Sequence, residues 1–248
     1  MTDVNYLPVF VAFRERDNYA EVFRSTLEDL ASKVDLSHVK SCVAFGTSSG
    51  EGEMEFARRL LPNLRSFTAV EKDPESIEAL RTNFQNGLLP GVETSVVETS
   101  LQSWSGVDNQ ADVVLLFNVL SPIQPTDRKA LFQKLMTQCL NSGGLVIIVN
   151  NVTSVPSGYV LLMNRLGAER VGFDELEEEV LAAGFRVVLK QDFAVTRDLS
   201  NPSDDLVKYI EMTTNHKFSE SEVRTAIDDI FSQPAMNVSP NRLAIFKK

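Results

Sequence analysis

Apolar residues along the chain fall into two alternating kinds of segment. Short, nearly continuous apolar runs are typical of buried strands, and they occupy residues 40–46, 66–71, 91–99, 111–119, 145–150, 186–193 and 242–246. Apolar residues three and four positions apart, often with Pro or Gly at the ends, predict helices over residues 17–33, 51–62, 74–87, 127–144, 173–185, 203–215 and 219–232. The alternation predicts an α/β, Rossmann-like fold, with one sheet of about seven mostly parallel strands between helices.

Two segments, 151–172 and 194–240, interrupt the alternation. They are candidates for lids over the C-terminal edge of the sheet, where open α/β sheets bind ligands. The last strand is expected to pair antiparallel with the strand at 186–193. We therefore expect a single domain over residues 1–248, with an N-terminal helical cap (1–38), a cofactor-binding core (39–150) and a part that holds the substrate lids and the C-terminal hairpin (151–248).

Composition narrows the choice of partner. Hydrophobic residues make up 43% of the 248 residues, enough for a sizeable core, and the formal net charge is −10. Nucleic acids and anionic membranes need a basic face, so this charge argues against both and favours a small-molecule substrate. No apolar run approaches the ~20 residues of a membrane span, and the start does not resemble a signal peptide. We expect a cytoplasmic monomer whose Cys42 and Cys139 are reduced core thiols.

The stretch VAFGTSSGEGE, residues 43–53, follows a predicted strand and precedes a predicted helix. Gly46, Ser48 and Gly50 have a G-x-[G/S]-x-G spacing, which lets the backbone approach a ligand beside the free N–H groups of a helix start. Glu71 ends the next strand, 21 residues after Gly50, where a carboxylate can accept hydrogen bonds from both ribose hydroxyls. The combination predicts a nucleoside-cofactor site. The alternative is an ordinary turn with a solvated Glu71.

The residues after the loop bear on which cofactor it binds. Glu51 and Glu53 would repel a phosphate at the helix start, which disfavours NAD. S-adenosylmethionine is a nucleoside cofactor with a sulfonium cation and no phosphate, so it fits this loop better. The C-terminal hairpin and the lack of a second catalytic domain also favour a class I methyltransferase over a dehydrogenase.

Methyl transfer from a sulfonium requires the acceptor to be held in line, about 3 Å from the methyl group, and it requires no strong base. The sequence accordingly predicts no catalytic acid or base and no metal site. His38 and His216 are isolated, although His216 could act as a base in the second lid. Asn118 ends a central strand, where its amide can bind a polar substrate or cap a helix. Tyr19 and Phe23 either contact the substrate or form the apolar face of a docked helix.

The order of these motifs resembles the histamine N-methyltransferase-like group of class I S-adenosylmethionine-dependent methyltransferases. The resemblance covers most of the chain. The group's N-terminal helix, Gly-rich loop and following cofactor segments correspond to DNYAEVFRSTLEDL, FGTSSGE, AVEKDPESIEAL, VVETSLQSW and ADVVLLFNVL. Its C-terminal segments correspond to FDELEEEVLAAGF, LVKYIEMTTNHKFSE and NRLAIF. The cofactor motifs are shared by many methyltransferases, whereas the C-terminal half points to this group.

The resemblance implies roles for single residues and methyl transfer to an amine nitrogen. On the cofactor side, the implied residues are Gly46 for the amino-acid end, Glu71 for the ribose with Ser76 nearby, Ser100 by the adenine, and Phe117 on the strand that closes the pocket. On the substrate side, they are Asn118 and Asn241 at substrate-binding positions, with Glu28 matching the amine-binding carboxylate across an alignment gap.

The chain departs from this group at positions where the group has aromatic residues around the methyl acceptor. The group's paired tyrosines after the fourth strand are Ser121 and Pro122 here, and its two lid tryptophans are Tyr159 and Met163. An aromatic box that grips an imidazole is therefore depleted, and histamine does not follow as the substrate. The alternatives to an amine acceptor are methylation of an oxygen, a sulfur or a carboxylate, and cofactor binding without turnover.

Overall fold

The structure, a computed structural model, describes residues 6–104, 110–168, 170–214, 217–232 and 237–248. The strands are β1 (Ser41–Phe45), β2 (Ser66–Glu71), β3 (Glu93–Glu98), β4 (Ala111–Phe117), β5 (Leu140–Asn151), β6 (Arg186–Thr196) and β7 (Val238–Lys247). The helices are α1 (Tyr6–Arg14), α2 (Tyr19–Ala31), α3 (Glu51–Leu60), α4 (Pro74–Gln85), α5 (Pro125–Lys134), α6 (Gly158–Arg165), α7 (Phe173–Ala182), α8 (Asp204–Thr213) and α9 (Glu220–Phe231), with a π-helical turn, η1 (Leu135–Cys139), after α5.

The strands form one mixed sheet in the order β3-β2-β1-β4-β5-β7-β6. Strands β1 to β5 are parallel, and β7 runs antiparallel to both β5 and β6. The predicted seven-stranded, mostly parallel sheet with an antiparallel C-terminal strand is confirmed. Because β1 and β4 occupy the centre, the loops that leave their carboxyl ends lie side by side at one edge of the sheet.

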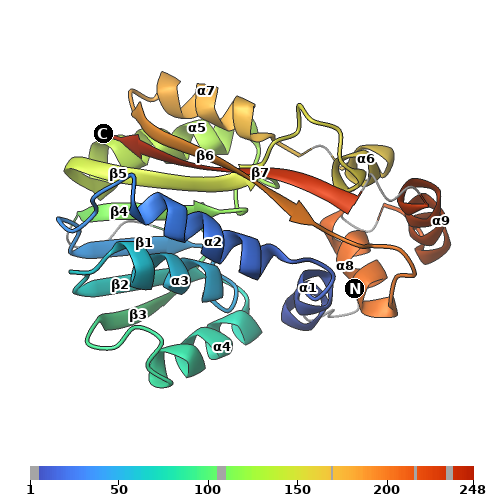
Figure 1. Cartoon of the computed structure of the whole chain (residues 1–248), viewed down its shortest axis with the longest axis horizontal. Helices are drawn as coiled ribbons and strands as arrows, with labels where there is room; N and C mark the ends of the chain where they lie inside the picture. The colour runs from blue at the N-terminus through green and yellow to red at the C-terminus, as the bar shows by residue number, and fades with distance from the viewer. Residues whose placement is uncertain (1–5, 105–109, 169, 215–216, 233–236) are drawn as a thin grey trace.

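Helices cover both faces of the sheet (Figure 1). Helices α2, α3 and α4 pack on one face through residues that include Phe23, Phe56 and Leu80. On the other face, α5 and α7 contribute Phe132 and Phe173. Burial on both faces explains why the central strands have continuous apolar runs and not an alternating pattern.

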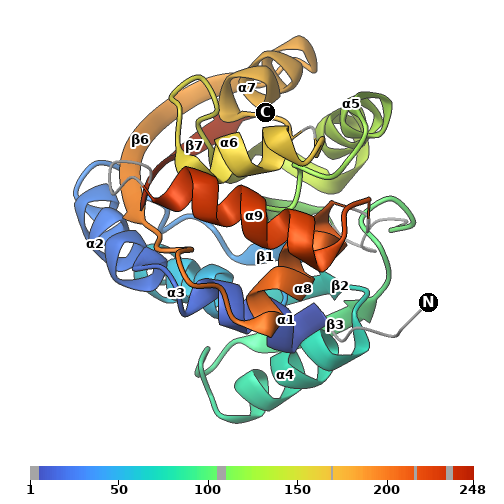
Figure 2. The ribbon, with the colours of Figure 1, turned by 90° about the vertical axis from the view of Figure 1, so that its right-hand side faces the viewer.

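Four helices, α1, α6, α8 and α9, gather beyond the edge where the parallel strands end (Figures 1 and 2). They share an apolar cluster of their own, with Phe13, Leu162, Leu206 and Ile227 among its members. Both segments predicted as lids contribute to this layer, and the N-terminal α1 completes it. We call these four helices the helical layer.

A buried ion pair ties the N-terminal segment to the chain after β6. Nη2 of Arg197 lies 3.0 Å from Oδ2 of Asp17, and the two side chains are 5% and 1% exposed. Next to it, the backbone N–H of Thr196 donates to Oδ1 of Asn18 at 2.8 Å. The connection between α1 and α2 is therefore held against the end of β6.

The structure differs from the prediction at residues 127–144. The α-helix ends at Lys134, a π-helical turn follows, and β5 already begins at Leu140. Asn-Ser-Gly-Gly resembles a helix end locally, but Leu140 pairs with Ala111 across a register shift and joins the sheet. Such a long-range pairing cannot be weighed from local signals. The sequence pattern also does not predict α1 or α6 as individual helices.

Candidate functional site

The loop after β1 turns sharply to begin α3. Gly46, Ser48 and Gly50 have positive φ angles of 58°, 49° and 78°. A Cβ at Gly46 would lie 2.4 Å from Cγ2 of Val119, and one at Gly50 would lie 2.6 Å from Cδ2 of Leu80. Both glycines are therefore required by the backbone conformation and by packing. The loop forms a tight backbone cradle at the centre of the sheet edge.

Glu71, at the end of β2, faces this loop. Its Oε2 accepts a hydrogen bond from the backbone N–H of Ser48 at 2.9 Å. Its Oε1 accepts from the N–H groups of Lys72 at 2.8 Å and Asp73 at 3.0 Å. A carboxylate has roughly four acceptor positions, so about one is left for a ligand. The structure thus joins the loop to the acid.

Three buried hydroxyl oxygens at the ends of β1 and β2 have no hydrogen-bond partner in the described part of the chain: Thr47 Oγ1, Ser48 Oγ and Ser76 Oγ. Ser76 lies in the first turn of α4, where its N–H donates to the N-cap residue Asp73 at 2.9 Å. Buried polar groups are seldom left unpaired, so these hydroxyls indicate a place for a polar ligand. Together with the cradle, they fit a nucleoside cofactor.

Ser100, the residue expected beside adenine, follows β3. It lies next to the strand of Glu71, because the N–H of Thr99 donates to the backbone oxygen of Glu71 at 2.9 Å. Trp104 belongs to the core: it is 2% exposed, and its ring meets Phe45 edge-on with centroids 4.8 Å apart. Ser100 therefore follows the strand that pairs with β2, whose last residue is Glu71.

Two of the expected substrate residues meet at the end of β4. Nδ2 of Asn118 lies 3.4 Å from the hydroxyl of Tyr19, and Asn118 has a φ of 56°. Tyr19 stacks on Phe23 with centroids 5.2 Å apart, and Phe23 meets Phe117 edge-on at 5.6 Å. The positive φ of Asn118 is a strained conformation for a residue other than glycine, so the contacts around Asn118 must hold it there. The result is an amide and a phenol presented on an aromatic wall.

Glu53 is a buried acid, although its sequence position had indicated only a negative charge at the start of the helix. It is 6% exposed in the first turn of α3, whereas Glu51 is exposed. Burial is the largest cause that raises the pKa of Glu53 to about 8, and the negative charge of Glu71 adds to it. Its spacing with Ala57 and Leu60, both on the buried face of α3, was the available signal.

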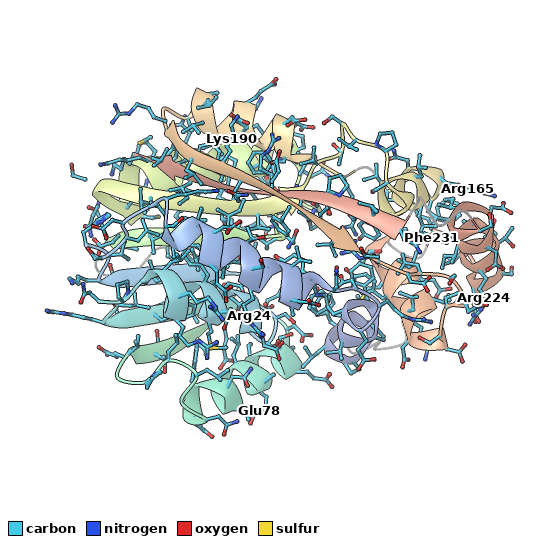
Figure 3. The ribbon with its side chains drawn as sticks, in the orientation of Figure 1. Arg24, Glu78, Arg165, Lys190, Arg224 and Phe231 are labelled. Atoms are coloured by element: carbon cyan, nitrogen blue, oxygen red, sulfur yellow. The ribbon has the colours of Figure 1, made fainter. Side chains whose placement is uncertain are left out.

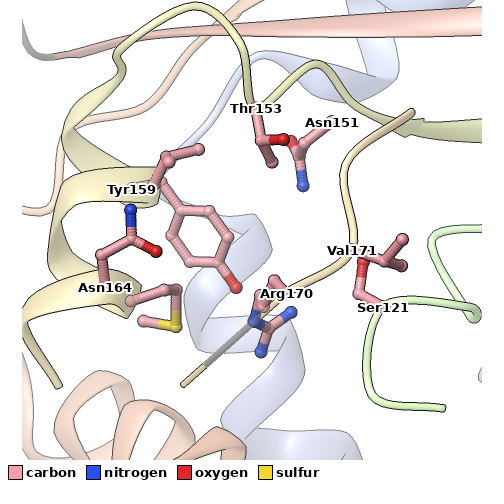
Figure 4. A pocket seen from close by; sticks show the side chains of 9 residues that line it. Ser121, Asn151, Thr153, Tyr159, Asn164, Arg170 and Val171 are labelled. Carbon is pink, nitrogen blue, oxygen red and sulfur yellow. The ribbon is translucent and has the colours of Figure 1, made fainter. Parts of the chain in front are cut away.

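A cavity of about 210 Å³ lies between the sheet edge and α6 (Figure 4). Its lining is Ser121, Asn151, Thr153, Tyr159, Val160, Met163, Asn164, Arg170 and Val171. Ser121, Tyr159 and Met163 occupy positions at which the resemblance places the acceptor's aromatic box. Tyr159 is 4% exposed, and its ring lies 5.4 Å from that of Phe13. We call this space the lid cavity.

Asn241 lies outside the lid cavity. It lines a second cavity, of about 490 Å³, together with Phe193. Its Nδ2 donates to the backbone oxygen of Ser239 at 2.9 Å. Phe193 is its register partner in β6, and the ring of Phe193 meets Tyr19 edge-on at 5.9 Å. Phe193 of β6 therefore lies between Asn241 and Tyr19.

The structure does not bring Glu28 to the site. Its side chain is 60% exposed, and its Oε1 lies 3.0 Å from Nη1 of Arg59 on the outer surface of α2 and α3. Leu27 and Leu30 face the core, and the helical period turns position 28 outward. This position does not support an amine-binding role for Glu28.

In the described part of the chain, no cluster of three or more His, Cys, Asp or Glu side chains is placed to hold a metal ion. No described helix has the length and apolarity needed to cross a membrane. His216 lies outside the described residues, and Cys42 and Cys139 are buried free thiols.

Comparisons with known proteins concern the fold and the family. Residues 43–144 match the sequence profile of a family described as a methyltransferase domain. A comparison with curated proteins finds no match. A putative methyltransferase from Bacillus halodurans C-125 has a similar structure, with a TM-score of 0.64 at 13% identity over 91% of this chain and 98% of the other.

Two further structures resemble this chain. The N-methyltransferase NodS from Bradyrhizobium japonicum WM9, in complex with S-adenosyl-L-homocysteine, has a TM-score of 0.60 at 13% identity over 99% of both chains. The mitomycin 7-O-methyltransferase MmcR has a TM-score of 0.57 at 16% identity, covering 92% of this chain and 54% of that one. Such identities establish the fold. Residues 43–144 therefore match a methyltransferase-domain family, and the chain as a whole has the fold of the class I, S-adenosylmethionine-dependent methyltransferases.

Proposed function

We propose that the protein transfers a methyl group from S-adenosylmethionine to an amine nitrogen of a small molecule. The observation that carries the proposal is the junction of Ser48 with Glu71, which combines a glycine cradle with a buried carboxylate. In this proposal, Gly46 and the loop N–H groups hold the amino-acid end of the cofactor. Glu71 and Ser76 hold the ribose, and Ser100 lies by the adenine.

When bound, the cofactor supplies a methyl group already activated by a positively charged sulfur. What remains for the protein is to hold the acceptor in line and to exclude water. Phe23 and Phe117 are buried apolar walls suited to excluding water. Tyr19 and Asn118 offer a hydroxyl and an amide that can orient a polar acceptor. No covalent intermediate and no metal is needed.

An amine is favoured over other acceptors for two reasons. The chain resembles a group of N-methyltransferases along most of its length, and its net charge of −10 attracts cationic molecules. A neutral amine is the reacting form, so an ammonium acceptor must first lose a proton. Because Ser121 and Met163 replace aromatic residues, the acceptor need not be an imidazole.

Calorimetric titration with S-adenosylmethionine, S-adenosylhomocysteine and NAD tests the cofactor. Micromolar binding of the first two and none of NAD is expected, whereas failure to bind either sulfur compound would sink the proposal. Transfer of labelled methyl to a panel of amines, alcohols, thiols and carboxylates then tests the acceptor. Products on alcohols or thiols alone would replace the amine assignment. Tight binding with no product from any acceptor would indicate a cofactor-binding protein without turnover.

The variants Tyr19→Phe and Asn118→Ala test the acceptor side separately. Loss of a neutral hydrogen bond costs about 0.5–1.5 kcal/mol, so each should raise KM for the acceptor by roughly twofold to tenfold. The affinity for S-adenosylhomocysteine should stay unchanged. An unchanged KM in both variants would remove these two residues from the acceptor site.

A further inference from the structure

The lid cavity contains a positive charge that the proposed function has not used. Arg170 contributes its guanidinium to the cavity wall, and Figure 4 shows the hydroxyl of Tyr159 directed toward it. The Cζ atom of Arg170 lies 5.5 Å from the centre of the Tyr159 ring. Within the described part of the chain, no carboxylate lies within ion-pair distance of Arg170.

Among the described residues, the titratable groups that act on the pKa of Arg170 are three tyrosines, Tyr159, Tyr209 and Tyr6. Burial is the largest cause that raises the pKa of Tyr6 and of Tyr209 above the usual range, so these phenols stay neutral at physiological pH. They can accept hydrogen bonds, yet they do not cancel the charge.

A second arginine nearby already has its counterion. Arg197 lies 4.9 Å from the centre of the Tyr159 ring, but its Nη2 and Nε both bond to Asp17. Asp17 also accepts from Nη1 of Arg14 at 3.1 Å, so it is shared between two arginines, and Nη1 of Arg197 is buried with no partner among the described residues. Among the described residues, Arg170 is therefore a cation of the cavity wall that has no ion-pair partner, in a protein whose formal net charge is −10.

The cavity lies next to the acceptor side of the proposed reaction. Ser121 lines it and is only three residues beyond Asn118, and Asn151 ends β5, the neighbour of β4. Ser121 Oγ donates to Asn150 Oδ1 at 3.0 Å, and Asn150 Nδ2 donates to the backbone oxygen of Val171 at 2.9 Å. These bonds fix the wall beside Arg170. The volume of about 210 Å³ is below the range for drug-sized ligands and suits a small metabolite.

We propose that Arg170 binds a carboxylate of the methyl acceptor, an inference that rests on the proposed function. The substrate class is then a small amino-carboxylate, with its amine at Tyr19 and Asn118 and its carboxylate in the lid cavity. A planar guanidinium matches a carboxylate through two parallel N–H···O bonds, which are stronger than bonds between neutral groups. A purely cationic amine such as histamine would be repelled by Arg170.

The test uses labelled S-adenosylmethionine and an ultrafiltered yeast metabolite extract as the source of acceptors. One portion is left untreated, one is esterified with acidic methanol to block carboxylates, and one is esterified and then hydrolysed with base. We expect methyl transfer with the first and third portions and a loss of tenfold or more with the second. Equal transfer with the esterified portion would overturn the assignment.

Substitutions at Arg170 test whether this side chain is responsible for the preference for a carboxylate. Arg170→Gln should lower the initial rate of methyl transfer to the untreated extract by roughly tenfold or more, because a charge-assisted bond is lost. Arg170→Lys should recover part of the lost rate. Arg165→Gln is the matched control, since Arg165 of α6 is 47% exposed and pairs with Asp229 of α9 at 2.7 Å (Figure 3). Activity of Arg170→Gln equal to that of Arg165→Gln would also overturn the assignment.

The failure of the proposed function gives a different result. If wild-type protein binds S-adenosylhomocysteine but labels nothing in the untreated extract, transfer to a small molecule is refuted and the carboxylate assignment falls with it. If labelling occurs with all three portions equally, methyl transfer stands and only the role of Arg170 is refuted. Unchanged affinity for S-adenosylhomocysteine in Arg170→Gln confirms that the variant is folded.

Discussion

The backbone N–H of Ser48 donates to Oε2 of Glu71 across the ends of β1 and β2, at 2.9 Å. This bond joins a loop residue in a left-handed conformation to an acid that is 8% exposed. Since Lys72 and Asp73 occupy the other oxygen, the carboxylate is oriented before any ligand arrives. A preoriented acceptor loses less conformational freedom on binding, so it contributes more to affinity.

Replacing this carboxylate tests the cofactor site. Glu71→Ala should weaken S-adenosylhomocysteine binding by roughly tenfold or more, because a charge-assisted hydrogen bond contributes about 1.5–3 kcal/mol. Calorimetry provides the measurement. Glu98→Ala is a matched control, since Glu98 is the register partner of Glu71 in β3 but its side chain is 55% exposed. Equal affinities in the two variants would refute the role of Glu71.

The glycine cradle can be separated into a backbone term and a packing term. Gly91 has a φ of 76° with open space around its Cβ position, so Gly91→Ala should cost about 1–2 kcal/mol of unfolding free energy. Gly46→Ala has the same backbone cost and also collides with Val119, which adds about 1–3 kcal/mol. Urea denaturation of both variants measures the difference. If Gly46→Ala were no less stable than Gly91→Ala, the packing argument would be wrong.

Glu53 makes the stability depend on pH. Its pKa is about 8 in the folded protein against an ordinary value of 4.5, so the folded state holds this proton more tightly. The stabilisation is complete below pH 4.5 and is lost as the pH rises through about 8. Glu53→Gln should therefore gain Tm relative to wild type as the pH is raised from 5 to 9.

The neighbouring acid is the control for this pH dependence. Glu51 lies two residues earlier in the same helical turn and is exposed. Glu51→Gln should show a Tm difference from wild type that hardly changes with pH. Parallel pH profiles of wild type and Glu53→Gln would contradict the burial argument.

A buried ion pair holds α5 against α7. Arg128 donates from Nε and Nη2 to the two oxygens of Glu179, at 2.8 and 2.7 Å, and the side chains are 3% and 7% exposed. Glu179→Ala leaves the guanidinium with Glu175 and the backbone oxygen of Ile123 as partners, and should cost about 1.5–3 kcal/mol of unfolding free energy.

The exposed Glu178, on the same helix, provides the comparison for this pair. Glu178→Ala should change the free energy of unfolding by no more than about 0.5 kcal/mol. Chemical denaturation of both variants decides the matter. A cost below 1 kcal/mol for Glu179→Ala would mean that neighbouring groups compensate for the lost carboxylate.

Hydrophobic patterning by itself determined the sheet and most of its helices. Strands buried on both faces leave continuous apolar runs, and helix ends carry Pro and Gly, so the order of elements can be read locally. The meeting of the Gly-rich loop with Glu71 was also predictable, because Gly46, Gly50 and Glu71 lie at the ends of adjacent parallel strands that the fold must bring together.

Only the tertiary structure decided which charged side chains are buried and which side chains line the lid cavity. Glu28 and Glu53 look alike as helical acids, but packing of α2 and α3 turns one to solvent and buries the other. Leu140 joins the sheet through a partner some thirty residues away, against its local helix-end signal. Arg170 lies beside Tyr159 in the wall of the lid cavity, and the other residues of that wall come from separate segments of the chain. Local spacing records which face of an element is apolar, whereas the charge and shape of a cavity depend on contacts between distant segments.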